Sequence, residues 1–262
     1  MKQFDVALHQ GSAGSAGDIA PIAADAARRG ALMLVCSEMS ATGYNIGPLI
    51  AERAEPRDGP LYDAMAAVAI ESSIALVYGY PEASDGQVFN SVQVIGRDGS
   101  PLASYRKTHL FGDLDRSNFA PGQTLIEQFD FGGMRCGLLI CYDVEFPEVV
   151  RAHADSGTEW LIVPTGLMTP YELVAEKVVP ARAYESQMFV TYVNRCGIEA
   201  DLEYCGSSCA IAPDGAELGR AGRGEQLLTV TIDPSTIARS RSVNTHLTDR
   251  RSDLYSTQEK TT

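Results

Sequence analysis

The segment GLLICYDVEFPE, residues 137–148, connects a short apolar run to a cysteine and then to an acidic stretch. Residues 137–140 predict a buried strand, and Pro147 is typical of the first turn of a helix. Cys141 would therefore lie at the end of a strand and just ahead of a helix, where a thiolate is favoured. This position makes Cys141 a candidate nucleophile and the backbone N–H of Tyr142 a candidate oxyanion donor. The alternative is a buried structural cysteine, since the chain contains six cysteines.

On both sides of this segment, stretches typical of strands alternate with stretches typical of helices. We predict strands at residues 4–9, 31–36, 74–80, 160–163 and 189–194, and helices at residues 18–29, 60–72, 147–156 and 172–186. Two hairpins are expected, one from residues 88–95 and 102–105 around Asp98-Gly99, and one across residues 207–232 around Asp214-Gly215. This order predicts an α/β protein with mixed sheets and helices outside them. No repeat or linker divides the sequence, so residues 1–262 are expected to form a single domain.

The composition narrows the classes of function. The 262 residues carry a formal net charge of −13, whereas nucleic-acid binders need positive charge to meet phosphates. No apolar run approaches the roughly 20 residues that span a bilayer, so no membrane partner is expected. The N-terminus lacks the apolar core of a signal peptide, which predicts a cytoplasmic protein with reduced thiols. The cysteines show no CxxC spacing and the four histidines show no ligand spacing, so no metal site is expected.

Two further segments carry candidate catalytic groups beside predicted strands. In LVCSEMSATGY, residues 34–44, Glu38 directly follows a buried strand and could act as a general base. In YRKTHLFG, residues 105–112, Lys107 could donate hydrogen bonds to a developing oxyanion. Taken alone, each residue has a simpler interpretation, because most acids and lysines are solvated at the surface. Their candidacy depends on reading the three segments together.

Together the three segments resemble the nitrilase superfamily of carbon–nitrogen hydrolases, and the resemblance covers nearly the whole chain. The similar motifs are TGY at 42–44, RKTHLF at 106–111, FAPG at 119–122, CYDVEFPE at 141–148, VPT at 163–165, ARAYE at 181–185, NRCG at 194–197 and DRRSDLY at 249–255. The resemblance implies a four-layer α-β-β-α sandwich and no metal or organic cofactor. It also implies homodimers in which the C-terminal tail, about 234–262, packs on the partner subunit. The catalytic triad that it implies is Glu38, Lys107 and Cys141.

One position departs from the pattern of the superfamily. Its members commonly carry a second active-site Glu between the lysine segment and the FxPG motif. Counting back from residues 121–122 places Asp115, whose side chain is one methylene shorter, in that position. Asp113 is a competing candidate if the loop shifts. Tyr44 and Thr165, which end two of the similar motifs, are candidate substrate contacts.

The resemblance implies that Cys141 attacks an amide carbonyl and forms a thioester, which water then hydrolyses. The CYDxxFPE pattern is similar to that of amidases, whereas true nitrilases usually carry Cys-Trp-Glu. Relatives that hydrolyse ω-amides of dicarboxylic acids carry an Arg four residues after the cysteine, where this chain has Glu145. A carboxylate there would repel an acidic substrate, so we predict a small aliphatic amide that is neutral or amine-bearing. Alternatively, Glu145 serves only to stabilise the start of the following helix.

Other functions remain as alternatives. An ω-amidase or an N-carbamoyl-amine hydrolase would use the same triad, and the second would release carbon dioxide along with ammonia. A papain-like hydrolase is disfavoured because His109 precedes Cys141 and no Asn partner is evident. A lone histidine in an apolar turn is more often structural. A non-catalytic relative that binds a small molecule or a protein is disfavoured, since all three triad positions hold competent residues.

Overall fold

The computed structural model describes residues 2–12 and 14–255. Within these ranges the strands form two six-stranded sheets and a separate two-stranded hairpin. The first sheet contains, in spatial order, β14 (Gln226–Ile232), β1 (Phe4–Gln10), β2 (Ala31–Val35), β3 (Ala75–Ser84), β4 (Gln87–Ile95) and β5 (Pro101–Arg106). The second contains β13 (Glu217–Arg220), β12 (Cys209–Ile211), β9 (Phe189–Val193), β8 (Trp160–Pro164), β7 (Met134–Leu138) and β6 (Gln128–Phe131). The hairpin consists of β10 (Cys196–Glu199) and β11 (Leu202–Cys205).

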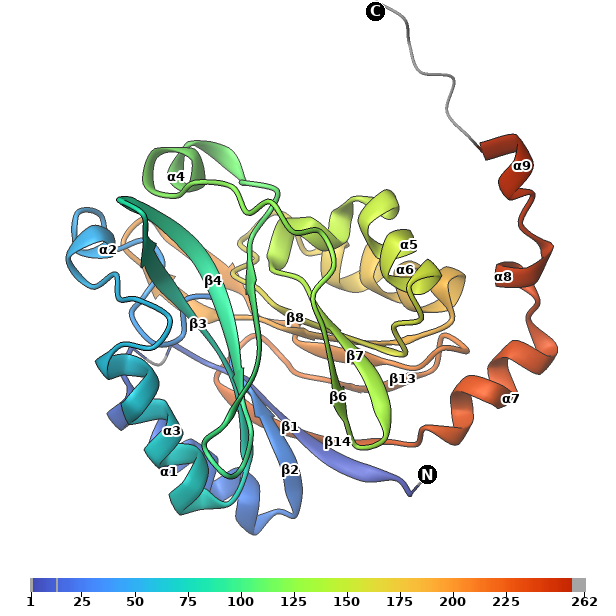
Figure 1. Ribbon diagram of the computed structural model, residues 1–262, viewed down its shortest axis with the longest axis horizontal. Helices are drawn as coiled ribbons and strands as arrows, with labels where there is room; N and C mark the ends of the chain where they lie inside the picture. The colour runs from blue at the N-terminus through green and yellow to red at the C-terminus, as the bar shows by residue number, and fades with distance from the viewer. Residues whose placement is uncertain (1, 13, 256–262) are drawn as a thin grey trace, which may run out of the picture.

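Helices cover the outer face of each sheet, so the molecule has four layers (Figure 1). On the first sheet lie α1 (Ala16–Arg28) and α3 (Pro60–Ser72), and on the second lie α5 (Pro147–Asp155) and α6 (Val179–Ser186). The short helices α2 (Leu49–Glu52) and α4 (Gly112–Asn118) occupy connections between strands. The C-terminal segment contains α7 (Ser235–Val243), α8 (His246–Asp249) and α9 (Ser252–Tyr255). This arrangement is the α-β-β-α sandwich that the sequence predicts.

Apolar side chains from the facing surfaces of the two sheets fill the space between them. The ring of Phe4 in β1 lies 5.9 Å from that of Trp160 in β8 and 5.8 Å from that of Phe131 in β6. The strands β1, β2 and β3 are parallel and most of their side chains are buried, which explains why the central strand β2 is apolar without alternation. In the second sheet the adjacent parallel strands are β7, β8 and β9. The carboxyl ends of parallel strands share one edge of a sheet, and loops there commonly form sites.

The predicted hairpin across residues 207–232 is wrong in its second half. Around Asp214-Gly215, β12 and β13 do pair with each other in the second sheet. The chain then crosses to the first sheet, where β14 pairs antiparallel with β1 over its full length, Phe4 opposite Ile232. A turn signal is local, whereas this pairing joins residues more than 200 positions apart. Sequence pattern alone therefore could not assign β14 to its sheet.

The predicted helix at 172–186 consists of two parts. A π-helical turn, Val174–Val178, leads directly into α6. Pro180 lacks a backbone N–H and stands in the first turn of α6, which breaks the regular hydrogen-bond ladder at this point. The sequence analysis also missed the β10–β11 hairpin and strand β6, which pairs antiparallel with β7.

The C-terminal segment leaves the body of the sandwich after β14, and its helices extend along the outside (Figure 1). Its apolar residues Val243, Leu254 and Tyr255 are exposed. Arg250 forms an ion pair with Asp155 of α5, which is one contact between this segment and the body. The part of the predicted tail at 256–262 lies outside the described residues. Within the described residues, no helix is both long enough and apolar enough to cross a membrane.

Candidate active site

Cys141 lies three residues beyond the end of β7, at the first position of a 3₁₀ turn, Cys141–Glu145. Its backbone is in the left-handed region, with φ of 47°. Such a conformation is strained for a residue with a side chain and recurs at functional sites. The thiol is largely buried, and the Thr165 hydroxyl and the Gly166 backbone N–H lie beside it. The sharp turn thus directs the thiol to the strand ends, where the other candidate groups meet.

Glu38 follows β2 and is buried, with its two carboxylate oxygens in different surroundings. Oε1 accepts hydrogen bonds from Asn90 Nδ2 at 2.7 Å and from Lys107 Nζ at 2.8 Å. Oε2 is buried and has no hydrogen-bond partner among the residues described. A Cβ atom placed on Gly166 would lie 3.1 Å from this oxygen, so the glycine leaves space next to it. One oxygen is therefore held in place, while the other is available to accept a proton.

A second glycine allows the loop that carries Glu38 to approach the sheet. A Cβ atom on Gly79 of β3 would lie 2.4 Å from the backbone nitrogen of Met39, well inside contact distance. Met39 itself has φ of 52°, which shows that the loop turns sharply immediately after Glu38. Any larger residue at position 79 would displace the backbone next to the candidate base.

Lys107 is completely buried at the end of β5, between two carboxylates. Its Nζ lies 2.8 Å from Glu38 Oε1 and 2.7 Å from Asp115 Oδ2. Burial alone would lower the pKa of Lys107, but the charges of Glu38 and Asp115 outweigh burial and raise it well above its ordinary value. Lys107 is therefore a permanent cation that can donate hydrogen bonds but cannot act as a base.

Of the two candidates for the second acid, Asp115 contacts Lys107 and Asp113 does not. It is fully buried in α4, whereas the side chain of Asp113 is fully exposed. Besides its contact with Lys107, Asp115 accepts hydrogen bonds from the Tyr44 hydroxyl at 2.8 Å and from the Phe111 backbone N–H at 2.8 Å. The shorter aspartate side chain thus still reaches Lys107.

The environment keeps the Cys141 thiol protonated at neutral pH. Burial raises the pKa of Cys141, and the negative charge of Glu38 raises it further, while Lys107 acts in the opposite direction. The net result lies well above the ordinary value for a cysteine. A neutral thiol is a weak nucleophile, so this site needs a base to remove the proton as the sulfur attacks.

The thiol opens onto a cavity of about 250 Å³. The lining residues are Tyr44, Phe111, Cys141, Tyr142, Glu145, Gly166, Leu167, Met168 and Tyr171. Most of them are apolar or aromatic, and the volume suits a small molecule. Tyr44 and Glu145, two of the candidate substrate contacts, therefore line this cavity. Thr165 does not line the cavity: it is fully buried behind Cys141, and its hydroxyl donates to the Tyr192 hydroxyl at 2.9 Å.

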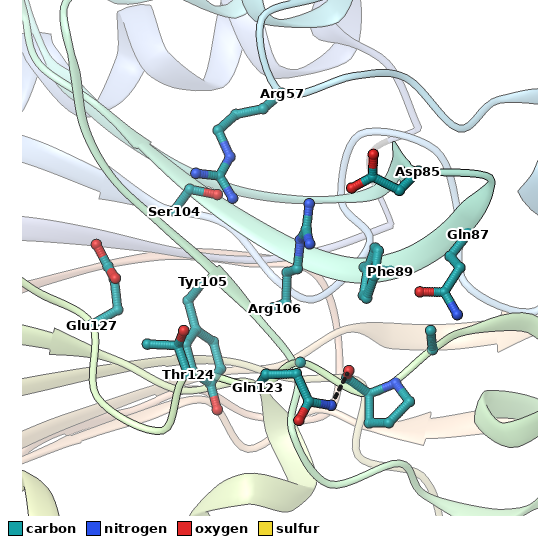
Figure 2. A pocket seen from close by; sticks show the side chains of 13 residues that line it. Arg57, Asp85, Gln87, Phe89, Ser104, Tyr105, Arg106, Gln123, Thr124 and Glu127 are labelled. Atoms are coloured by element: carbon teal, nitrogen blue, oxygen red, sulfur yellow. Dashed lines mark hydrogen bonds between the residues drawn. The ribbon is translucent and has the colours of Figure 1, made fainter.

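A larger hollow, of about 700 Å³, lies elsewhere on the molecule and contains no cysteine. Figure 2 shows Arg57 and Arg106 on one side of it and Gln123 and Thr124 on the other. The guanidinium of Arg106 stacks on Phe89 at 3.9 Å and donates to the buried Glu82 at 2.6 Å. The Lys107 side chain, next along the chain, instead points into the interior toward Glu38. Of the three candidate catalytic residues, Cys141 lines the smaller cavity, and Glu38, which binds Lys107, lies next to Gly166 in the wall of that cavity.

Asp143 connects the lysine segment to the cysteine segment. Its buried carboxylate accepts hydrogen bonds from the Tyr105 hydroxyl at 3.0 Å, the Thr108 hydroxyl at 2.8 Å and the Ile140 backbone N–H at 3.2 Å. His109 Nδ1 lies 2.8 Å from the same carboxylate, and its ring stacks on Phe146. The histidine is therefore bound to Asp143, in agreement with a structural role.

An ion pair that the sequence analysis did not identify supports the loop that carries Glu38 and Tyr44. Arg195 is almost completely buried, and its Nη1 donates to the backbone oxygens of Glu38 at 3.2 Å and Met39 at 3.3 Å. Its Nη2 donates to Glu199 of β10 at 2.8 Å. Arg195 lies in the NRCG motif, but only its contacts in the fold connect it with the base.

Glu199 extends this support to Tyr44. Its carboxylate accepts hydrogen bonds from the backbone N–H groups of Tyr44 at 3.1 Å and Asn45 at 2.8 Å, and from the Tyr204 hydroxyl at 2.6 Å. Burial opposes the ionisation of Glu199, but Arg195 and these donors keep its pKa below the ordinary value. Because the Tyr44 hydroxyl binds Asp115, Glu199 is connected to both acidic partners of Lys107.

Replacing Glu199 with glutamine should lower kcat by about 10- to 100-fold while KM changes little, because small displacements of catalytic groups have effects of this size. The substitution removes the charge that pairs with Arg195 and leaves an amide of the same shape. The control is Glu203→Gln on the adjacent strand β11, whose exposed carboxylate lies 3.9 Å from Arg223. Steady-state kinetics and thermal melting of both variants check this. Equal rates for the two variants would contradict a positioning role.

Comparison with known proteins agrees with this geometry. Residues 12–242 match the family model for carbon-nitrogen hydrolase. A protein of Pseudomonas protegens described as a hydrolase in the pqqF 5′ region is 46% identical over 85% of this chain and 79% of its own length. An (R)-stereoselective amidase of a Pseudomonas species is 38% identical over 84% of this chain and 79% of its own length.

Among solved structures, a mutant amidase of Nesterenkonia sp. AN1 has a TM-score of 0.86 and 31% identity, covering 96% of this chain and 95% of its own. It carries the acetamide moiety of fluoroacetamide covalently bound at its active-site cysteine. The chain belongs to the carbon–nitrogen hydrolase family. It is therefore a hydrolase that acts on carbon–nitrogen bonds.

Proposed function

We propose that this protein hydrolyses a small aliphatic amide to a carboxylic acid and ammonia through a thioester on Cys141. The observation that carries the proposal is that the Cys141 thiol lines a small cavity and Glu38 lies next to Gly166 in its wall. One oxygen of Glu38 has no hydrogen-bond partner among the described residues, and the other binds the buried ammonium of Lys107. The relatives named as amidases, and the solved amidase with an adduct at its cysteine, support the same chemistry.

In the first half-reaction, Glu38 takes the proton of the Cys141 thiol as the sulfur attacks the amide carbonyl carbon. Lys107 and the backbone N–H of Tyr142 stabilise the negative charge that develops on the carbonyl oxygen. The tetrahedral intermediate then expels the nitrogen, which takes the proton from Glu38 and leaves as ammonia. The product bound to the enzyme is a thioester.

In the second half-reaction, Glu38 removes a proton from water, whose oxygen attacks the thioester carbonyl. The same donors stabilise the second oxyanion. Collapse of this intermediate breaks the carbon–sulfur bond, releases the acid and returns the proton to Cys141. A single carboxylate acts alternately as base and acid, and Asp115 positions Lys107 through their direct contact.

The cavity favours a neutral or amine-bearing substrate over an acidic one. Glu145 is a carboxylate in the cavity wall, and a second carboxylate on the substrate would be repelled by it. An ω-amidase acting on a dicarboxylic acid monoamide and an N-carbamoyl-amine hydrolase are the alternatives that use the same triad. Tyr44 contacts the substrate in this proposal, while Thr165 contacts the thiol.

Ammonia release from a panel of compounds tests the proposal. The panel contains propionamide, glutamine, 2-oxoglutaramate, an N-carbamoyl-amine and a simple nitrile. We expect release from neutral amides, without carbon dioxide. Release only from 2-oxoglutaramate would replace the substrate class by ω-amides, and carbon dioxide together with ammonia would indicate a carbamoylase. Absence of release from every compound would overturn the proposal in favour of a binding protein.

We further infer that residues 1–262 act as one domain in a cytoplasmic homodimer, with the segment from about 234 onward packed on the partner subunit. The exposed apolar residues Val243, Leu254 and Tyr255 support this, because packing would remove them from water. Light scattering should give twice the chain mass for the full chain and the mass of one shortened chain for a version ending at Asn244. A shortened version that still has twice its own chain mass would contradict the role of the segment.

A further inference from the structure

Glu145 has a carboxylate without a partner in the wall of the active-site cavity. Among the described residues, no hydrogen bond or ion pair involves its side-chain oxygens, although its backbone oxygen accepts from Arg182 Nη2 at 2.8 Å. Burial raises the pKa of Glu145, and the charges of Lys107 and Arg182 only partly oppose this. A half-buried carboxylate that lacks a partner is costly unless another molecule supplies one.

The nearest cations are already bound to other groups. Arg182 donates Nε to the Val144 oxygen at 3.1 Å and Nη1 to Glu185 at 2.9 Å, besides its contact with the Glu145 backbone. Lys107 is held between Glu38 and Asp115. The site therefore has two carboxylates in contact with one ammonium and a third carboxylate, Glu145, in the cavity wall, so an additional positive charge would be stabilised there.

The contacts do not support a purely structural role for Glu145 at the start of α5. An acid that caps a turn accepts hydrogen bonds from backbone N–H groups, as the nearby Asp143 does from Ile140 and His109. No such bond reaches the Glu145 carboxylate within the described part of the chain. Its position is instead defined by its backbone, which leaves the side chain directed at the cavity.

The rest of the wall is suited to a short cationic chain. The aromatic residues Phe111, Tyr142 and Tyr171 form edge-to-face pairs beside the cavity, with ring centroids 5.2 and 5.7 Å apart. Aromatic faces attract ammonium groups and also accept methylene groups. Leu167 and Met168 add apolar surface on the side of Gly166. A substrate could thus place methylenes along this wall while its amide reaches Cys141.

We propose that Glu145 binds a protonated amine of the substrate, an inference that rests on the proposed amidase function. The preferred substrates are then primary amides with an ammonium group at the far end of a short aliphatic chain. The carboxylate fixes the charged end, and the thiol receives the amide end. This requirement excludes ω-amides of dicarboxylic acids more strongly than it excludes neutral amides.

The test uses matched pairs of amides that differ only by an ammonium in place of a methyl group. They are 3-aminopropanamide with butanamide, 4-aminobutanamide with pentanamide, and 5-aminopentanamide with hexanamide. Ammonia release gives kcat/KM for each at neutral pH. In at least one pair the wild type should prefer the amine by about tenfold or more, the size expected for a hydrogen bond between charged groups. Glu145→Gln, which keeps the shape and the backbone contact, should bring that ratio close to one.

The outcomes separate this inference from the proposed function. Hydrolysis of the neutral amides without preference for any amine would overturn the role of Glu145 and leave the amidase proposal intact. The role of Glu145 is equally overturned if Glu145→Gln keeps the preference while its melting temperature matches the wild type. Absence of ammonia from all six amides would overturn both proposals. Glu145→Arg provides a second measurement, because it should turn the preference for an amine into discrimination against it.

Discussion

Replacing Cys141 with alanine should lower ammonia release from any substrate amide by about 10⁴-fold or more, because the carbon–sulfur bond of the intermediate can no longer form. The fold should be unaffected. Alanine removes one buried sulfur, and the left-handed backbone at this position is equally strained for both residues. Steady-state ammonia release and thermal melting of the purified variant check both statements.

Cys136→Ala is the matched control for this variant. Cys136 is also buried and lies in β7, five positions before Cys141, but its thiol faces the backbone oxygens of Phe131 and Met134 rather than the cavity. We expect a modest loss of stability, as for other small deletions in a core, and turnover close to that of the wild type. Equal loss of turnover in the two variants would indicate damage to the fold and would remove the support for Cys141 as nucleophile.

The sequence made Glu38, Lys107 and Cys141 candidates because each lies just beyond a predicted strand, and the resemblance to the nitrilase superfamily grouped them as a triad. Glu38 follows β2, Lys107 directly follows β5 and Cys141 follows β7, and these ends lie at the same side of the sandwich. Apolar runs predict the strands, and the following polar residue is then the one that reaches the site. Asp115 was a candidate for the second acid from its spacing to the FAPG motif, and the structure places it in contact with Lys107.

The remaining features depend on contacts between distant parts of the chain. Glu199 lies in a hairpin that the pattern of residues did not reveal, and its partners Tyr44 and Asn45 are more than 150 positions away. Strand β14 was predicted to belong to the hairpin across residues 207–232 for the same reason, whereas it pairs with β1. The position of Thr165 behind the thiol also depends on how β8 and β9 pack, because its hydroxyl is bound by Tyr192. Local sequence contains no information about such pairings.

Replacing Glu38 with glutamine should lower turnover by about 10²- to 10⁴-fold, the contribution typical of a positioned general base. The amide keeps the shape of the carboxylate, and its oxygen can still accept hydrogen bonds from Asn90 and Lys107. What is lost is the ability of the free oxygen to take a proton from the thiol. Asn90→Ala is the informative control, since it removes one hydrogen bond to Glu38 and leaves the base, and should retain far more activity. Similar losses in both variants would indicate that the hydrogen-bond geometry, and not the basicity of Glu38, limits the rate.

The Glu38→Gln variant also distinguishes the two ways in which the Cys141 thiol could be activated. If Lys107 alone produced a resting thiolate, alkylation of Cys141 by iodoacetamide in Glu38→Gln would be fast and nearly independent of pH around neutrality. Burial, however, raises the pKa of Cys141, and its proton must leave before the sulfur can react. The substitution removes the charge of Glu38, which also raises this pKa, but burial is the larger cause and remains. The thiolate fraction should therefore still be small at neutral pH and should increase as the pH rises toward the pKa of the thiol. Alkylation followed by mass spectrometry should accordingly be slow at pH 7 and accelerate steadily into the alkaline range. A flat pH profile would mean that the ammonium of Lys107 is sufficient to hold a thiolate, and that Glu38 acts only later, on the leaving nitrogen and the attacking water.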